Sequence, residues 1–295
     1  MKKIAIITDS SADIPERLAV ENEITIVPMY LSFGGKSYRE GMDVRTEQVY
    51  QALKSGFKVT TSAPPVGDFI KIFKDLIDNK KKEIIYYIGL SSKLSGILNS
   101  ARVAKTNFQE DKIKIFDSKT STISLGLIVL EAARAIKKGI CLEKLNGIIQ
   151  ELINNSCFSA TLESMEYVFK GGRAAYLSKF LSSAFVLKPI LTIGKDGRVK
   201  LKKFAKNKKT AILELINQAK KELIRLKTMC YKKCSLGIFY GSDINPALQI
   251  EEALKKDEQA SSMIGEIITT EITTIISAHT GPEIWGVATA PELEY

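Results

Sequence analysis

The stretch IIYYIGLSSKLSGILNSARVA, residues 84–104, decides the fold class of this chain. It opens with the apolar run Ile84–Leu90, which is typical of a strand buried on both faces of a parallel sheet. The polar segment Ser91–Gly96 follows and opens a helix that continues through Ala104. A buried strand that leads through a polar loop into a helix is the repeating unit of α/β proteins.

The same order recurs in the first half of the chain. The strand-like run Lys3–Ile7 leads into Thr8–Pro15, where Ser or Asp can cap a helix. The strand Lys112–Phe116 leads through Asp117–Ser121 into a long helix over Thr122–Lys138. We therefore expect an N-terminal α/β/α domain with a mainly parallel sheet. Its other expected elements are the β-rich segment Ile24–Phe33, the helices Thr46–Lys54 and Val66–Asp78, and a loop at 60–65.

After about residue 156 the pattern changes. The turn Gly194–Gly197 separates two β-rich segments and is typical of a hairpin. Strands beside helices with hairpin connections predict a smaller α+β domain, so we expect domains over residues 1–156 and 157–295. The expected strands are Ser156–Leu162, Ile190–Ile193, Val199–Phe204, Ser235–Tyr240, Ile264–Glu271 and Trp285–Thr289, and the expected helices are Leu162–Phe169, Tyr176–Leu187, Lys209–Leu226 and Pro246–Lys256.

The composition is that of an ordinary globular protein, and 295 residues are long for one hydrophobic core. No apolar run is long and uninterrupted enough to span a bilayer, and Met1–Lys3 leads into a strand instead of a signal peptide. The four cysteines show no disulfide framework. We therefore expect a reduced, cytoplasmic protein.

The net charge of +10 raises nucleic acid, an anionic membrane or an acidic partner as candidates. Much of the excess lies in Lys80–Lys82, Arg198–Lys209 and Lys220–Lys233. Neither zinc-finger spacing nor an aromatic RNA-binding signature accompanies these segments. We expect solvated lysine surfaces and no nucleic-acid binding.

Four polar loops point to an anion site. Thr8–Asp13, Thr60–Ser62, Ser91–Gly96 and Asp117–Ser121 each follow a strand or open a helix. In open α/β sheets such loops gather at the carboxyl edge of the strands, where ligands bind. Hydroxyls and free amides at helix starts favour an anion, although any one of these loops alone is also explained as a helix cap.

His279 is the only histidine and lies close to the only tryptophan, Trp285, around a Thr-Gly-Pro turn. One imidazole cannot build a His-rich metal site, and Cys230 and Cys234 have no further ligand nearby, so we expect no metal and no cofactor. The simplest role of His279 is to hold a turn. The hydroxyl of Thr280 and the N–H of Gly281 instead indicate a donor cluster suited to an anion.

Taken together, these motifs resemble the DegV family. They occur in the family's order over essentially the whole chain: Thr8–Pro15, Thr61-Ser62-x-Pro64, Leu94–Gly96 with Asn99–Ala101, Asp117-Ser118, Gly171–Arg173, Lys188–Leu191, and His279–Pro282 with Gly286. The resemblance implies a two-domain α/β fold that encloses a long-chain fatty acid between the domains. Some bacterial members are the binding subunit of a fatty acid kinase, whose separate ATP-using subunit converts the acyl carboxylate to an acyl phosphate.

The resemblance also implies roles for individual residues. The head group would be bound by Thr61, Ser62, Ser95, Gly96, His279, Thr280 and Gly281. Arg173 would lie at the pocket mouth and meet the kinase subunit or the phosphate, and transient membrane contact is compatible with a lipid carrier. Departures from the family pattern at Ala63, Pro65, Ile97 and Leu98 leave the finer details of the head-group network unspecified.

Three apolar segments are candidates for the wall of an acyl channel: Phe180–Leu191, Ile123–Ile136 and Ile264–Ile276. Ordinary core packing explains each of them equally well. Arg198, Lys200 and Lys202 alternate along an expected strand and therefore share one face, which suits an acidic kinase subunit or a solvated surface.

Two other functions fit parts of the sequence. A serine hydrolase would use Ser95, His279 and Asp117, but Ser95 lies in Leu-Ser-Gly and not in the Gly-x-Ser-x-Gly elbow that exposes a nucleophile. A nucleic-acid binder would rest on charge alone. The sequence therefore favours a non-catalytic protein that binds a fatty acid.

Overall fold

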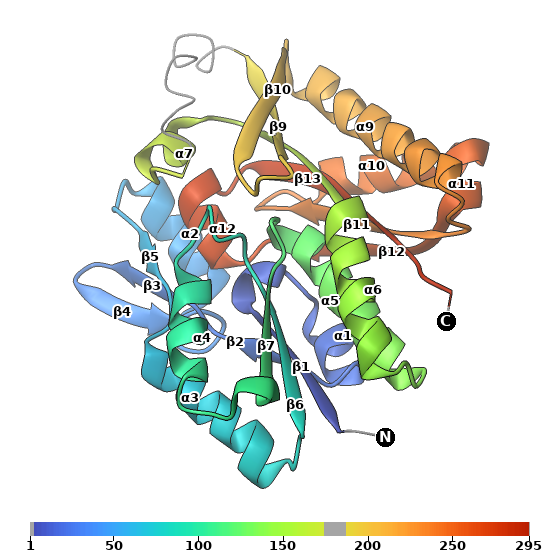
Figure 1. Cartoon of the computed structure of the whole chain (residues 1–295). Helices are drawn as coiled ribbons and strands as arrows, with labels where there is room; N and C mark the ends of the chain where they lie inside the picture. Colours follow the sequence, from blue (N-terminus) through green and yellow to red (C-terminus); the bar gives the residue numbers. More distant parts are fainter. Residues whose placement is uncertain (1–2, 174–186, 295) are drawn as a thin grey trace.

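The first half of the chain is built on a parallel four-stranded sheet. A computed structural model describes residues 3–173 and 187–294 (Figure 1). The strands are β1 (Ile4–Asp9), β2 (Ile24–Val27), β6 (Ile84–Gly89) and β7 (Ile113–Asp117), in the order β2-β1-β6-β7. All three pairings are parallel, so the expected α/β fold class is confirmed for this half.

Helices cover both faces of this sheet because successive strand residues point to opposite sides. Ile85 and Tyr87 pack with α3 and α4, whereas Tyr86 and Ile88 pack with α1, α5 and α6. The helices are α1 (Glu16–Glu21), α2 (Thr46–Lys54), α3 (Val66–Lys74), α4 (Ile97–Lys105), α5 (Thr122–Lys137) and α6 (Leu142–Asn155). Short helical turns are η1 (Ser10–Ala12), η2 (Asp75–Asn79) and η3 (Glu110–Lys112).

A small antiparallel sheet lies beside this layer and brings a polar strand toward the second half. Its order is β4-β3-β5, with β3 (Tyr30–Phe33), β4 (Lys36–Arg39) and β5 (Thr60–Ser62). Gly34 and Gly35 have φ of 57° and 75° and form the β3–β4 turn, as expected for a hairpin. The expectation of a loop at 60–65 is wrong for 60–62, because this segment pairs with β3.

The second half has its own six-stranded mixed sheet in the order β10-β9-β8-β13-β11-β12. The strands are β8 (Cys157–Leu162), β9 (Lys188–Ile193), β10 (Val199–Ala205), β11 (Cys234–Tyr240), β12 (Ile264–Glu271) and β13 (Ile284–Pro291). The β11–β12 pair is parallel and the other pairs are antiparallel. The separate sheet confirms the expected fold class of the second half. The predicted boundary at 156 falls between α6 and β8 and stays a prediction.

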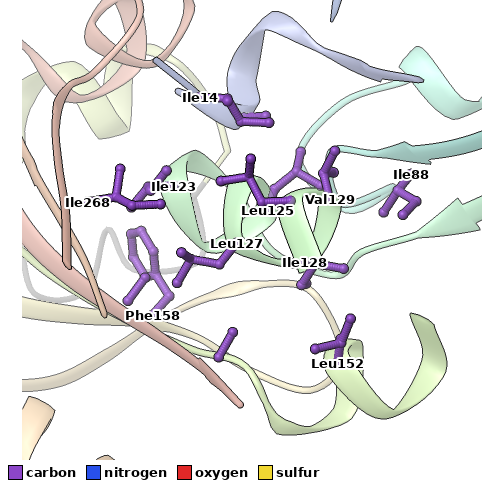
Figure 2. Packing of buried hydrophobic residues seen from close by; sticks show 14 of the residues in the cluster. Ile14, Ile88, Ile123, Leu125, Leu127, Ile128, Val129, Leu152, Phe158 and Ile268 are labelled. Carbon is purple, nitrogen blue, oxygen red and sulfur yellow. The ribbon is translucent and has the colours of Figure 1, made fainter. Parts of the chain in front are cut away.

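The two faces of this sheet have different partners. On one face, α9 (Lys208–Thr228), α10 (Asn245–Lys256) and α11 (Glu258–Met263) form a core with β11 and β13. The other face packs against α5, which is buried on nearly all sides (Figure 2). Ile123 and Leu127 lie near Phe158 and Ile268, whereas Val129 lies toward Ile88. α5 therefore joins the two halves through one continuous core.

Several expected elements need correction. Residues 142–155, for which the sequence analysis predicts no element, form α6. The helix expected over Leu162–Phe169 is α7 (Glu166–Lys170), because Leu162 is the last residue of β8. His279 and Thr280 lie in the last turn of α12 (Thr274–Thr280) and not in a turn of irregular chain. The helix expected over Tyr176–Leu187 falls almost entirely outside the described residues.

Candidate ligand-binding site

A cavity of about 110 Å³ is lined by residues from both halves of the chain. Phe158, Ala160 and Leu162 alternate along β8 and all reach it, as the two-residue period of a strand requires. Most of the wall is apolar, and its polar members are Thr61, Ser95, Ser121, Thr122, Arg173, His279 and Thr280.

Only parts of the three candidate wall segments reach the cavity. Leu191, Ile275 and Ile276 line it. For Ile123–Ile136 the core-packing alternative holds, because this segment of α5 packs between the two sheets and does not line the cavity. Of Phe180–Leu191, residues 180–186 lie outside the described part of the chain.

Thr61 and His279 meet at one end of the cavity. The Thr61 Oγ1 and His279 Nε2 atoms are 2.7 Å apart, although the residues are 218 positions apart in the sequence. β5 presents Thr61, and the last turn of α12 presents His279. A Cβ on Gly171 would lie 2.6 Å from His279 Nδ1, so the absence of a side chain at Gly171 lets the imidazole pack there.

The imidazole is neutral at pH 7. Burial, helped by the nearby charge of Arg173, lowers the pKa of His279 to about 4. Nδ1 is buried and has no hydrogen-bond partner among the described residues. A buried N–H without an acceptor is less favourable in free energy than a buried, unprotonated ring nitrogen without a donor. The ring proton therefore lies on Nε2, which donates a hydrogen bond to the Thr61 hydroxyl. The hydroxyl proton of Thr61 is then free to bind an acceptor.

Ser95 and Arg173 stand at the same end. Ser95 Oγ accepts the N–H of Ile97 at 3.2 Å, which leaves its hydroxyl proton available. Arg173 donates from Nε to the carbonyl of Leu94 at 3.3 Å and from Nη1 to the carbonyl of Gly171 at 2.8 Å. These two carbonyls fix the guanidinium beside the cavity without neutralising its charge.

The remaining expected site residues are placed differently. Ser62 and Gly96 are exposed and do not line the cavity, because Ser62 follows Thr61 on a strand and points the other way. Thr280 lines the cavity, but its hydroxyl has the carbonyls of Ile276 and Gly281 at 3.1 Å as acceptors. The expectation that Gly281 offers a free N–H is wrong, since this N–H donates to the carbonyl of Ser277 at 2.8 Å.

A second hollow, with many exposed residues in its wall, adjoins the polar end. Thr61, Arg173 and His279 line it as well as the cavity, so these three side chains form the partition between the two spaces. Lys54, Lys58 and Lys170 add basic side chains to its wall, which Glu166 partly offsets by pairing with Lys170 at 2.6 Å. The second hollow is therefore basic.

The geometry lends no support to a serine hydrolase. His279 Nε2 contacts Thr61, whereas Ser95 hydrogen-bonds the first turn of α4. Asp117 accepts hydrogen bonds from Ser92 and from the N–H of Lys119, so it stabilises the loops that carry these residues. Within residues 3–173 and 187–294 there is no group of three or more His, Cys, Asp or Glu side chains placed to hold a metal ion.

The expected basic strip is largely paired. Arg198, Lys200 and Lys202 are exposed, but a β-bulge between Leu201 and Lys203 interrupts the alternation that would place all three on one face. Lys200 pairs with Asp196 at 3.2 Å, and Lys202 donates to Gln218. No helix in the described part of the chain has the length and apolar character needed to cross a bilayer.

Curated relatives match nearly the full length of the chain. A DegV domain-containing protein of Caldanaerobacter subterraneus subsp. tengcongensis is 32% identical over 288 residues, covering 97% of this chain and 98% of the relative. Protein DegV of Bacillus subtilis is 26% identical over 288 residues, covering 96% and 98% of the two chains.

Solved structures share the fold at lower identity. A fatty-acid-binding DegV family protein of Thermus thermophilus has a TM-score of 0.88 at 24% identity, over 98% of this chain and 99% of that one. A stearic-acid-binding protein of Eubacterium ventriosum has a TM-score of 0.87 at 22% identity, over 99% of each chain. The model of the DegV family, described as uncharacterised proteins, matches residues 3–292. The chain therefore belongs to the DegV family.

Proposed function

We propose that the protein binds one long-chain fatty acid, with its carboxylate at the Thr61–His279 end and its acyl chain in the apolar cavity. The observation that carries this proposal is a cavity whose wall is mainly apolar and which has hydroxyl donors, a neutral imidazole and an arginine at one end. DegV proteins of known structure, such as that of Bacillus subtilis, bind fatty acids. Proteins of this class need no catalytic group of their own.

The polar end offers a carboxylate several donors. Thr61 can donate because His279 Nε2–H satisfies its oxygen, and Ser95 can donate because its oxygen already accepts from Ile97. Each hydrogen bond to a charged acceptor contributes about 1.5–3 kcal/mol. Arg173 also lines this end, where the carbonyls of Leu94 and Gly171 hold its guanidinium.

The acyl chain supplies most of the affinity. Each buried methylene gains about 0.8 kcal/mol, so a chain of about sixteen carbons is retained strongly even after the cost of immobilisation. Phe158, Leu191 and Ile193 offer side chains with no polar atom to desolvate. A buried ligand of this kind leaves slowly and is expected to survive purification.

Native mass spectrometry of the purified protein tests this proposal. We expect an adduct of about one fatty acid per chain, which denaturation releases and which gas chromatography of the lipid extract identifies. A protein that carries no stoichiometric lipid, and takes up none when fatty acid is added, would show that the cavity has another ligand.

We further propose that the protein presents the carboxylate to an ATP-dependent fatty acid kinase subunit. The position of Thr61, Arg173 and His279 supports this step. These three side chains line both the acyl cavity and the basic hollow, and so lie between the two spaces. A carboxylate oxygen would attack the γ-phosphorus of ATP held by the partner, the bond to ADP would break, and an acyl phosphate would form. The free thiols of all four cysteines fit the reduced cytoplasm where such a partner would act.

Arg173→Ala tests the presenting step. The variant should retain its fatty acid but lose most acyl-phosphate formation in a reconstituted reaction with a kinase subunit and ATP, because a cation at the partition balances the transferred phosphoryl group. Arg198→Ala removes an exposed arginine that lines neither space and is the matched control. Normal phosphorylation of Arg173→Ala would exclude this role.

A further inference from the structure

The cavity has a second polar place, away from the Thr61–His279 end. Ser121 and Thr122 line it at the start of α5. Ser124, in the same helical turn, donates to the carbonyl of Cys157 at 3.4 Å, so this helix start lies at the Phe158 end of β8. Leu162, at the other end of β8, pairs with Ile284 close to α12. Phe158 and Leu162 are separated by about 13 Å along the strand.

Thr122 has an unsatisfied hydroxyl at this place. The residue is 2% exposed, and its Oγ1 has no hydrogen-bond partner among the described residues. A buried hydroxyl without a partner is unfavourable, so a group that is not part of the chain is expected to satisfy it. Thr122 also has φ of 55°, a conformation that a β-branched residue rarely adopts.

The start of α5 adds donors and a positive potential. Ser121 is the residue before the first turn, yet its side chain makes no capping hydrogen bond. The first N–H groups of a helix have no partner within the helix, and the helix dipole is positive there. The first turn carries no acidic residue. The place therefore favours an oxygen atom that accepts hydrogen bonds, and the two hydroxyls can also donate or accept.

From this geometry we propose that Ser121 and Thr122 bind an oxygen carried on the acyl chain itself. The ligand class would be a long-chain fatty acid with a hydroxyl or keto group at or beyond mid-chain. This inference rests on the proposed function, because it assumes that the carboxylate lies at the Thr61–His279 end. It adds a second specificity element, besides the Thr61–His279 end, to a mainly apolar wall.

The test compares stearic acid with hydroxystearic acids whose hydroxyl lies at successive positions from the middle of the chain to its end. Each competes with a fluorescent fatty acid for the delipidated full-length protein. We expect at least one isomer to bind about 10-fold more tightly than stearic acid, since one buried hydrogen bond is worth about that factor. The measured quantity is the ratio of the two affinities within each variant.

Thr122→Val removes the hydroxyl and keeps the branched shape, and it should reduce that ratio to about 1. Ser121→Ala should reduce it too and serves if Thr122→Val does not fold. Thr289→Val is the control, because Thr289 is also buried with an unpartnered Oγ1 but does not line the cavity. This control should keep the wild-type ratio.

Three outcomes would overturn the inference. If the wild-type protein binds no hydroxystearic acid more tightly than stearic acid, Ser121 and Thr122 do not bind an oxygen of the acyl chain. A preference that survives both variants would locate the oxygen elsewhere, and an equal loss in Thr289→Val would reflect general destabilisation. In each case stearic acid still binds, so the failure differs from failure of the proposed function, in which no fatty acid binds.

Discussion

His279 is the only imidazole of the chain, and its surroundings decide its protonation. Because burial and Arg173 lower its pKa to about 4, the folded state binds this proton more weakly than the unfolded state, whose pKa is about 6.5. The resulting contribution to stability is complete above pH 6.5 and is lost as the pH falls toward 4. At full loss it is worth about 3 kcal/mol.

This predicts a pH dependence that His279→Gln abolishes. Urea unfolding of delipidated protein at pH 7 and near pH 4.5 should show a larger loss of stability for the wild type than for the variant. Proton NMR gives the pKa directly, since one histidine yields one assignable set of ring signals. A measured pKa near 6.5, with equal losses in both proteins, would mean that the ring is not held as described.

At the scale of elements, α12 positions His279 and is itself held by two buried carboxylates of the first half. Asp13 Oδ1 accepts the N–H of Thr273 at 2.8 Å, and Glu40 accepts from the hydroxyl of Thr274 at 3.3 Å. Burial raises the pKa of Asp13 well above its ordinary value and also raises the pKa of Glu40. Each carboxylate is therefore costly to ionise, yet together they anchor the start of the helix.

Asp13→Ala should destabilise the protein by about 1–3 kcal/mol, because the N–H of Thr273 loses its acceptor. Asp13→Asn keeps an acceptor and removes the charge. A raised folded-state pKa means that Asp13 contributes less stability as the pH rises through that pKa, so the Asn variant should lose less stability between pH 5 and 8 than the wild type.

Urea unfolding at these two pH values checks the Asp13 prediction, and fatty-acid affinity serves as a second readout of where α12 lies. If Asp13→Ala and Asp13→Asn were equally stable and equally able to bind, the Thr273 bond would not anchor the helix.

The elements that the sequence predicted well are long and strongly patterned. The apolar run at 84–90 and the helix pattern after residue 121 became β6 and α5. α6 carries buried Leu145, Ile149 and Leu152 at helical spacing, a pattern that is visible in the sequence and typical of an amphipathic helix. β5 and α12 are too short to show a period, and they form because β3 and the two carboxylates hold them.

The candidate site was predictable only in part for the same reason. The motifs around Thr61, Ser95, Arg173 and His279 resemble the DegV family, and the structure brings these residues to one end of a cavity. No local pattern reveals that Thr61 and His279 touch, since 218 positions separate them. Nor does any local pattern show that the N–H of Gly281 donates to the carbonyl of Ser277. This hydrogen bond depends on where α12 ends.

At the scale of the whole molecule, α5 lies between two sheets and joins them into one core (Figures 1 and 2). The cavity forms where both halves contribute wall residues, so ligand binding and the packing of the halves are coupled. The net charge of +10 is accompanied by exposed ion pairs such as Arg17–Glu21 and Lys256–Glu252. Such pairs stabilise little and are consistent with a solvated basic surface.

The most direct test of the central claim compares a long-chain fatty acid with its methyl ester on the delipidated protein. The two ligands share the acyl chain, so their affinities differ through the head group. We predict that the acid binds at least about 10-fold more tightly and that Thr61→Val removes most of this difference, whereas Ser62→Ala, at an exposed position beside it, does not. Equal affinities of acid and ester for the wild type would contradict a carboxylate at the Thr61–His279 end.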